Sequence, residues 1–76
     1  MLKKLNEMTV GESGKIVSVA GEGKLRRRLF DMGVTPGASV TVVKFAPLGD
    51  PIEVNLRGYA LTLRKSEAVN VGVETA

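Results

Sequence analysis

The groups that could do chemistry in this 76-residue chain are hydroxyls, carboxylates and basic side chains, because the sequence contains no histidine and no cysteine. The chain therefore lacks the usual catalytic bases and nucleophiles, and the strongest protein ligands for zinc, copper or iron. Its eight acidic residues are scattered without a paired spacing, and none of its serines has an evident base partner. We expect no catalysis, no metal site and no cofactor.

The densest charge is the run Arg26-Arg27-Arg28, in a chain of formal net charge +3. Such a run could bind nucleic-acid phosphates. On a helix, however, successive side chains point about 100° apart, so the three arginines do not form one patch. The chain has only two phenylalanines and one tyrosine to stack on bases. A solvated face is the favoured interpretation, followed by a protein contact and then by a nucleic-acid contact.

Three other features suit contact with a partner. The segment APLGDP at residues 46–51 holds two prolines and a glycine, so its shape is largely preset. It also presents Leu48, and a preorganised loop with an apolar tip loses little freedom on binding. From these features alone, a plain structural loop is the commoner interpretation, and a partner-binding loop is the alternative. Phe30 lies off the apolar stripe of the predicted helix, and Tyr59 falls in a predicted hairpin tip. Each aromatic either packs over the edge of the fold or anchors a partner.

The elements that must position these residues are mostly strands. Short apolar runs are separated by glycine or proline about every 8–12 residues, which is typical of a small barrel or sandwich. We predict strands over residues 15–20, 39–45 and 69–73. In the first of these, Ile16 lies on one face, and Val17 and Val19 lie together on the other.

One helix is predicted over residues 24–32. Its period places Leu25, Leu29 and Met32 on one stripe, and Gly33 follows where a left-handed residue would end it. A single short helix is unstable alone in water, so we expect this stripe to cover one end of a barrel.

A hairpin is predicted over residues 52–65. The two-residue loop Gly58-Tyr59, with glycine first, fits a type II′ turn. This loop would place Leu56 opposite Leu61, and Val54 opposite Leu63. Residues 66–68 form a short turn, and residues 74–76 a frayed end.

This order of elements predicts a mainly β fold: a small SH3-like β-barrel of five to six short strands, with one short helix between the first and second strands. We expect it to form a single domain over residues 1–76. The main rival is a five-stranded OB barrel, whose helix normally lies between the third and fourth strands. An unpaired barrel edge could also pair with a second copy.

The sequence predicts a cytoplasmic location. Two lysines stand near the start, but no apolar run of about 7–15 residues follows them, so a secretory signal is not expected. No stretch approaches the roughly 18 apolar residues of a membrane helix.

Three segments resemble the ferrous iron transport protein A (FeoA) family: LFDMGVTPG at residues 29–37, FAPLGDPI at 45–52 and LTLRKSEA at 61–68. The resemblance runs from about Leu5 to Val73. It implies an SH3-like barrel and a role in bacterial ferrous iron uptake. It also implies a small cytoplasmic protein that acts with the membrane transporter FeoB, which has a cytoplasmic GTP-binding domain.

Together, the residues and the resemblance predict a non-enzymatic adaptor that regulates or assembles the transporter. The predicted contact residues are Arg27, Phe30, Leu48, Asp50 and Tyr59. The predicted core residues are Leu25, Leu29, Met32, Val54, Leu56, Leu61 and Leu63. The alternative is a basic nucleic-acid-binding barrel of the ribosomal or transcription-factor type. A third hypothesis is weak binding of Fe²⁺ by oxygen ligands.

Overall fold

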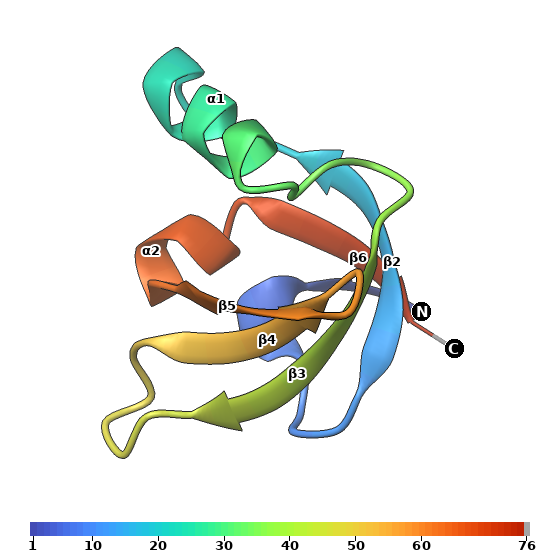
Figure 1. The fold of residues 1–76 in the computed structure, drawn as a ribbon, viewed down its shortest axis with the longest axis vertical. Helices are drawn as coiled ribbons and strands as arrows, with labels where there is room; N and C mark the ends of the chain where they lie inside the picture. Colours follow the sequence, from blue (N-terminus) through green and yellow to red (C-terminus); the bar gives the residue numbers. More distant parts are fainter. Residues whose placement is uncertain (76) are drawn as a thin grey trace.

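The computed structural model of the chain describes residues 1–75, which form six antiparallel strands in the order β1-β6-β2-β3-β4-β5, curled into one sheet (Figure 1). The elements are β1 (Leu2–Lys4), a 3-10 helix η1 (Leu5–Glu7), β2 (Ser13–Val19), α1 (Gly23–Asp31), β3 (Ser39–Phe45), β4 (Ile52–Leu56), β5 (Tyr59–Leu63), α2 (Lys65–Ala68) and β6 (Val71–Thr75). The predicted class, mainly β with a short helix, is confirmed. No helix within residues 1–75 is long and apolar enough to cross a bilayer.

The core lies inside the curled sheet and is made by the alternate residues of five strands. Its fully buried strand residues are Ile16, Val40, Val42, Ile52, Val54, Leu56, Leu63, Val71 and Val73. Burying each such side chain stabilises the fold by about 1.5–3 kcal/mol. Of the predicted inner residues of the hairpin, Leu61 alone is only half-buried, because β5 lies at the edge of the sheet.

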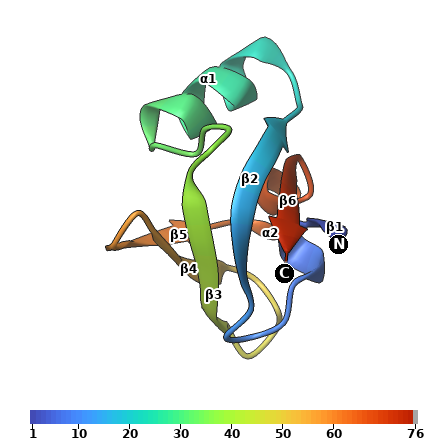
Figure 2. The ribbon, with the colours of Figure 1, turned by 90° about the vertical axis from the view of Figure 1, so that its right-hand side faces the viewer.

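Helix α1 covers one end of the sheet, as its apolar stripe predicts (Figures 1 and 2). Leu29 is fully buried, whereas Leu25 and Met32 are half-buried and pack against the core. The helix ends as predicted, because Gly33 follows Met32 with a φ of 91°, a conformation that favours glycine. The predicted bounds differ from the observed ones by one residue at each end.

The hairpin forms, but its predicted turn and register are wrong. The turn is Arg57-Gly58, with φ angles of 53° and 93°, so both residues are left-handed as in a type I′ turn. The N–H of Gly58 donates to the side-chain oxygen of Asn55 at 3.0 Å, which supports this turn. Leu56 consequently faces Tyr59, and Val54 faces Leu61. The register differs by two residues, so the predicted inner residues keep their face.

A β-bulge in β2 makes the faces of its side chains differ from the prediction. Its register against β6 shifts between Ile16 and Ser18. The extra residue is Val17, whose side chain is exposed, and the strand then resumes with Val19 pointing into the core. Val17 and Val19 therefore do not share a face. A second shift, next to Val43 in β3, leaves that side chain exposed as well.

The two ends of the described chain pair with each other, which the sequence analysis did not predict. Strand β1 pairs with β6, and the N–H of Thr75 donates to the carbonyl oxygen of Met1 at 2.8 Å. The expected frayed end is thus wrong for Glu74 and Thr75, while Ala76 lies outside the described residues. Because β1 comes first, α1 follows the second strand rather than the first. The short helix α2 also stands where a turn was predicted, at residues 66–68.

Candidate partner-binding surfaces

The outer face of α1 carries the first two predicted contact residues. Arg27 is exposed and Phe30 is half-buried, and both line a shallow hollow with Gly23, Arg26 and Asp31. The guanidinium carbon of Arg26 lies 4.8 Å from the centre of the Phe30 ring, a cation–π contact. This surface therefore consists of the Phe30 ring, the Arg26 guanidinium that packs against it, and the neighbouring Arg27 side chain.

The other arginines of α1 are engaged within the molecule. The Nε of Arg26 donates to the carbonyl oxygen of Val19 at 3.1 Å. Arg28 Nη1 lies 3.5 Å from Oε2 of Glu67, a buried carboxylate on α2 whose other oxygen accepts the N–H of Arg64 at 2.9 Å. These contacts tie α1 to β2 and α2. Two of the three consecutive arginines thus hold the helix in place.

Tyr59 connects the hairpin to the end of α1. Its side chain is 45% exposed, and its hydroxyl donates a hydrogen bond to the carbonyl oxygen of Met32. A Cβ at Gly33 would lie only 2.5 Å from that hydroxyl oxygen, so glycine at residue 33 allows the tyrosine to approach this closely without a shift. The ring of Tyr59 remains accessible, whereas its hydroxyl has a structural role.

The loop of residues 46–51 presents the most exposed large apolar side chain, Leu48, at 96%. Two backbone hydrogen bonds fix the loop beneath it. The N–H of Gly49 donates to the carbonyl of Ala46 at 2.7 Å, and the N–H of Ala46 donates to the carbonyl of Pro51 at 3.0 Å. The loop thus holds an apolar side chain in water on a preset backbone, as the sequence predicts.

Asp50 has a structural contact in the same loop. Its Oδ1 accepts the N–H of Lys65, the first residue of α2, at 2.9 Å. The first N–H groups of a helix have no partner inside the helix, so this carboxylate satisfies one of them and anchors the loop to α2. Asp50 therefore shapes the loop whatever else it contacts.

The five predicted contact residues do not form one surface. Arg27 and Phe30 lie on α1, and the hydroxyl of Tyr59 contacts the C-terminal end of that helix. Leu48 and Asp50 lie in the loop between β3 and β4, at the opposite end of the long axis from α1 (Figures 1 and 2). A partner contacting both groups would have to span the molecule.

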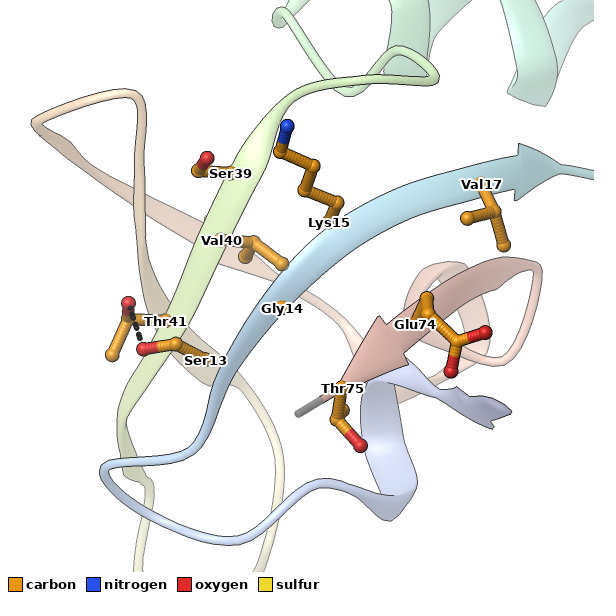
Figure 3. Close-up of a pocket in the computed structure, with 9 residues that line it drawn as sticks. All are labelled: Ser13, Gly14, Lys15, Val17, Ser39, Val40, Thr41, Glu74 and Thr75. Carbon is orange, nitrogen blue, oxygen red and sulfur yellow. Dashed lines mark hydrogen bonds between the residues drawn. The ribbon is translucent and has the colours of Figure 1, made fainter. Parts of the chain in front are cut away.

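A third surface, which the sequence analysis missed, is a hollow on the outer side of the sheet (Figure 3). It is lined by Ser13, Gly14, Lys15, Val17, Ser39, Val40, Thr41, Glu74 and Thr75. The small polar residues of β2 and β3 are visible in the sequence, but only the strand register brings them together.

Two hydroxyls of this hollow, those of Ser13 and Thr41, bond to each other. Ser13 Oγ lies 2.7 Å from Thr41 Oγ1, and the nearby carboxylate of Glu74 pairs with the amino group of Met1 at 2.7 Å. The hydroxyl of Ser13 is thus paired with another hydroxyl and not with a basic group. Within residues 1–75, no three acidic side chains lie close enough to hold a metal ion together.

The surroundings of Glu12 change the acidity of its carboxyl group. Its Oε1 accepts the N–H of Thr9 at 3.0 Å, and its Oε2 lies 2.9 Å from Nζ of Lys3. The hydrogen bond from Thr9, followed by the contact with Lys3, lowers the pKa of Glu12 below its ordinary value of 4.5. A lowered folded-state pKa stabilises the fold above the ordinary pKa, and this contribution is lost as the pH falls through the folded-state pKa.

Replacing Glu12 with glutamine is expected to change how stability depends on pH. The native chain should be more stable than Glu12→Gln near neutral pH, and the difference should shrink between about pH 5 and pH 3. Urea unfolding midpoints measured across this range test the prediction. Lys3→Gln, which removes one cause of the lowered pKa, should show an intermediate pH dependence. A difference that stays constant down to about pH 3 would contradict the assignment.

Comparison with known proteins identifies the family. Residues 3–75 match the model of the FeoA domain. The solution structure of FeoA from Chlorobium tepidum is 48% identical, with a TM-score of 0.89, over 96% of this chain and 70% of that chain. FeoA of Stenotrophomonas maltophilia, described as an SH3 domain protein and crystallised with zinc, is 31% identical over 97% of this chain and 89% of that chain, with a TM-score of 0.79. The fold is therefore SH3-like, as predicted.

A third relative is a fusion protein of Porphyromonas gingivalis, which joins Fe²⁺ transport protein A to the Fe²⁺ transporter FeoB. It is 38% identical over 71 residues, which are 93% of this chain and 8% of the fusion. The chain thus spans a small fraction of that relative's length. On the family model and these relatives, the chain belongs to the FeoA domain family.

Proposed function

We propose that this protein is a non-enzymatic accessory and regulatory protein of bacterial ferrous iron uptake. It acts in the cytoplasm by contact with a FeoB-type membrane transporter, at the transporter's GTP-binding cytoplasmic domain. The observation that carries the proposal is the Porphyromonas gingivalis fusion, in which a segment 38% identical to this chain shares one polypeptide with FeoB.

Fusion supports direct contact because it holds two partners near each other. A short flexible linker gives an effective concentration of the order of millimolar, at which a weak interface is occupied much of the time. The surfaces described above provide two candidates on opposite ends of the molecule.

The proposed contact residues form an α1 group and a loop group. The α1 group is Arg27, Phe30 and Tyr59, and the loop group is Leu48 and Asp50. Leu48 is the strongest anchor, because it is apolar, 96% exposed and held on a backbone that two hydrogen bonds already fix. Preorganisation of this kind lowers the entropy lost on binding. Asp50 contributes through the shape of the loop as well as through its charge.

The structure favours a protein partner over nucleic acid. A phosphate-binding surface would need several basic groups pointing the same way. Arg26 instead donates to the Val19 carbonyl and covers Phe30, and Arg28 faces the carboxylate of Glu67. All three arginines are exposed, but within residues 1–75 Arg27 is the one that makes no such contact.

A pull-down of detergent-solubilised FeoB-type transporter by the tagged protein tests the proposal. The native chain should capture the transporter, and Leu48→Ala should capture roughly tenfold less, because it removes the apolar anchor. Leu48→Ala should leave stability within about 0.5 kcal/mol, since the side chain is exposed. The matched control is Val10→Ala, which shortens an exposed apolar side chain outside the candidate surfaces and should leave capture unchanged. Absence of capture in every nucleotide state would contradict the proposal.

A further inference from the structure

The sheet has two edge strands, and they differ in the features that normally prevent an edge from pairing with other chains. The outer strands are β1 and β5. Strand β1 has three residues, two of which are lysines. Strand β5 has five residues with the sequence YALTL, which contains no charge and no proline. Natural sheets usually protect their edges with short strands, lysines or prolines, because an open edge pairs with other chains. Within Tyr59–Leu63 itself, β5 has neither a lysine nor a proline, and it is longer than β1.

The register shows which backbone groups this edge presents. Leu56 and Tyr59 flank a two-residue turn, so they form a hydrogen-bonded pair, and Val54 and Leu61 form the next one. The N–H and C=O groups of the residues between, Ala60 and Thr62, must therefore point away from β4.

These outward groups are accessible to a binding partner. In the part of the chain that the structure describes, β5 has no other neighbouring strand, and neither N–H has a hydrogen-bond partner. Ala60 and Thr62 are both exposed. The edge thus offers two donors and two acceptors at the spacing of an antiparallel or parallel strand.

Basic residues stand at both ends of the edge. Arg57 precedes β5, and Arg64 and Lys65 follow it, all three exposed. This arrangement argues against a second copy of the chain. Pairing two β5 strands antiparallel about Leu61 would bring Arg57, in the turn before β5, towards Lys65, the first residue of α2 in the second copy. Like charges brought together in this way oppose the pairing. The same charges attract a strand that is flanked by acidic residues.

We propose that the free edge of β5 binds an extended segment of another protein as an added strand, and that this segment has acidic residues at its ends. Backbone hydrogen bonds to Ala60 and Thr62 supply the main attraction, and Arg57, Arg64 and Lys65 select the charge. This surface is separate from the Leu48 loop, although its first residue, Tyr59, also belongs to the proposed α1 group. Its test therefore uses a peptide and no transporter.

A labelled peptide of five alternating valines and threonines, with two glutamates at each end, is the probe. On its addition, amide signals of residues 59–63 should shift in nuclear magnetic resonance spectra, and amide exchange at Ala60 and Thr62 should slow at least about tenfold. The same peptide with N-methylated backbone amides should not bind. Equal binding of both peptides, or shifts confined to α1 or to residues 46–51, would overturn the proposal.

Variants at Thr62 separate backbone from side-chain effects. Thr62→Pro removes the outward N–H but no bond to β4, so an edge strand should tolerate it. It should weaken peptide binding about tenfold, whereas Thr62→Ala should bind like the native chain. If Thr62→Pro fails to fold, the proposal is tested by amide exchange at Ala60 and Thr62 in the native protein, with and without the peptide. The proposal would be refuted if a folded Thr62→Pro variant bound the peptide as well as the native chain does. It would also be refuted if dimerisation protected the amides of Ala60 and Thr62 from exchange without any peptide.

Discussion

Leu29→Ala is expected to lower the free energy of unfolding by about 2–5 kcal/mol, the largest loss from one side chain that we predict. Leu29 is fully buried between α1 and the sheet, so the change removes its apolar contacts and leaves a cavity. A domain of this length has a total stability of about 4–11 kcal/mol. The variant should therefore melt far lower, or not fold at physiological temperature.

Urea unfolding measures this loss, with Leu25→Ala as the matched control. Leu25 lies one turn earlier on α1 and is only half-buried, so the same truncation should cost clearly less. The transition of Leu29→Ala should remain single and cooperative, because α1 is also tied to β2 and α2 through Arg26 and Arg28. A loss below about 1 kcal/mol would show that α1 contributes little to the stability of the barrel.

The second large effect is expected for Gly14→Ala. Gly14 lies in β2 between Val40 on β3 and Thr75 on β6, so the strand cannot move to either side. An added Cβ would lie 2.5 Å from the carbonyl oxygen of Glu74 and 2.7 Å from Cγ1 of Val73. The first of these atoms is backbone and cannot rotate away. Overpacking of this kind costs about 1–3 kcal/mol and should loosen the pairing of β2 with β6.

Gly23→Ala is the control for this prediction, because an added Cβ at Gly23 meets nothing within 4 Å. Gly23 is the first residue of α1, where alanine should raise stability by about 0.4–1 kcal/mol by restricting the unfolded chain. Melting temperatures of the two variants should therefore move in opposite directions. Equal effects would mean that the close approach at Gly14 is relieved at little cost.

Local signals in the sequence predict the elements that local interactions decide. Strand β3 is predicted with its observed bounds, since Val40 and Val42 alternate with Thr41 and a turn containing Pro36 and Gly37 precedes it. Gly33 likewise marks the end of α1. These features depend on neighbouring residues alone, so they can be read without the fold.

The errors concern interactions between distant residues or competing local ones. Strand β1 has too few residues to show a pattern, and it is held by β6 at the far end of the chain. In the hairpin, glycine-first and glycine-second turns both suit the sequence. Arg57 adopts the left-handed conformation and donates from Nη2 to Thr35 Oγ1 at 3.1 Å, a contact that the sequence does not reveal.

For the candidate surfaces as well, some features could be predicted from nearby residues and others depend on the fold. The exposure of Leu48 follows from the composition of its loop. The separation of Leu48 from Arg27 and Phe30 depends on the topology, which puts α1 and the β3–β4 loop at opposite ends. The hydrogen bonds of Tyr59 to Met32 and of Asp50 to Lys65 join residues 27 and 15 positions apart, so only the fold shows that both side chains are also structural.

The pairing of β1 with β6 makes the described chain nearly a closed ring. Met1 and Thr75 are joined by hydrogen bonds, and both ends lie on the same side of the molecule, away from α1 and from the β3–β4 loop (Figure 1). A neighbouring domain attached before β1 or after β6 would thus leave from the same place. The covalent order of two such domains can change while their spatial relation and their accessible surfaces stay the same.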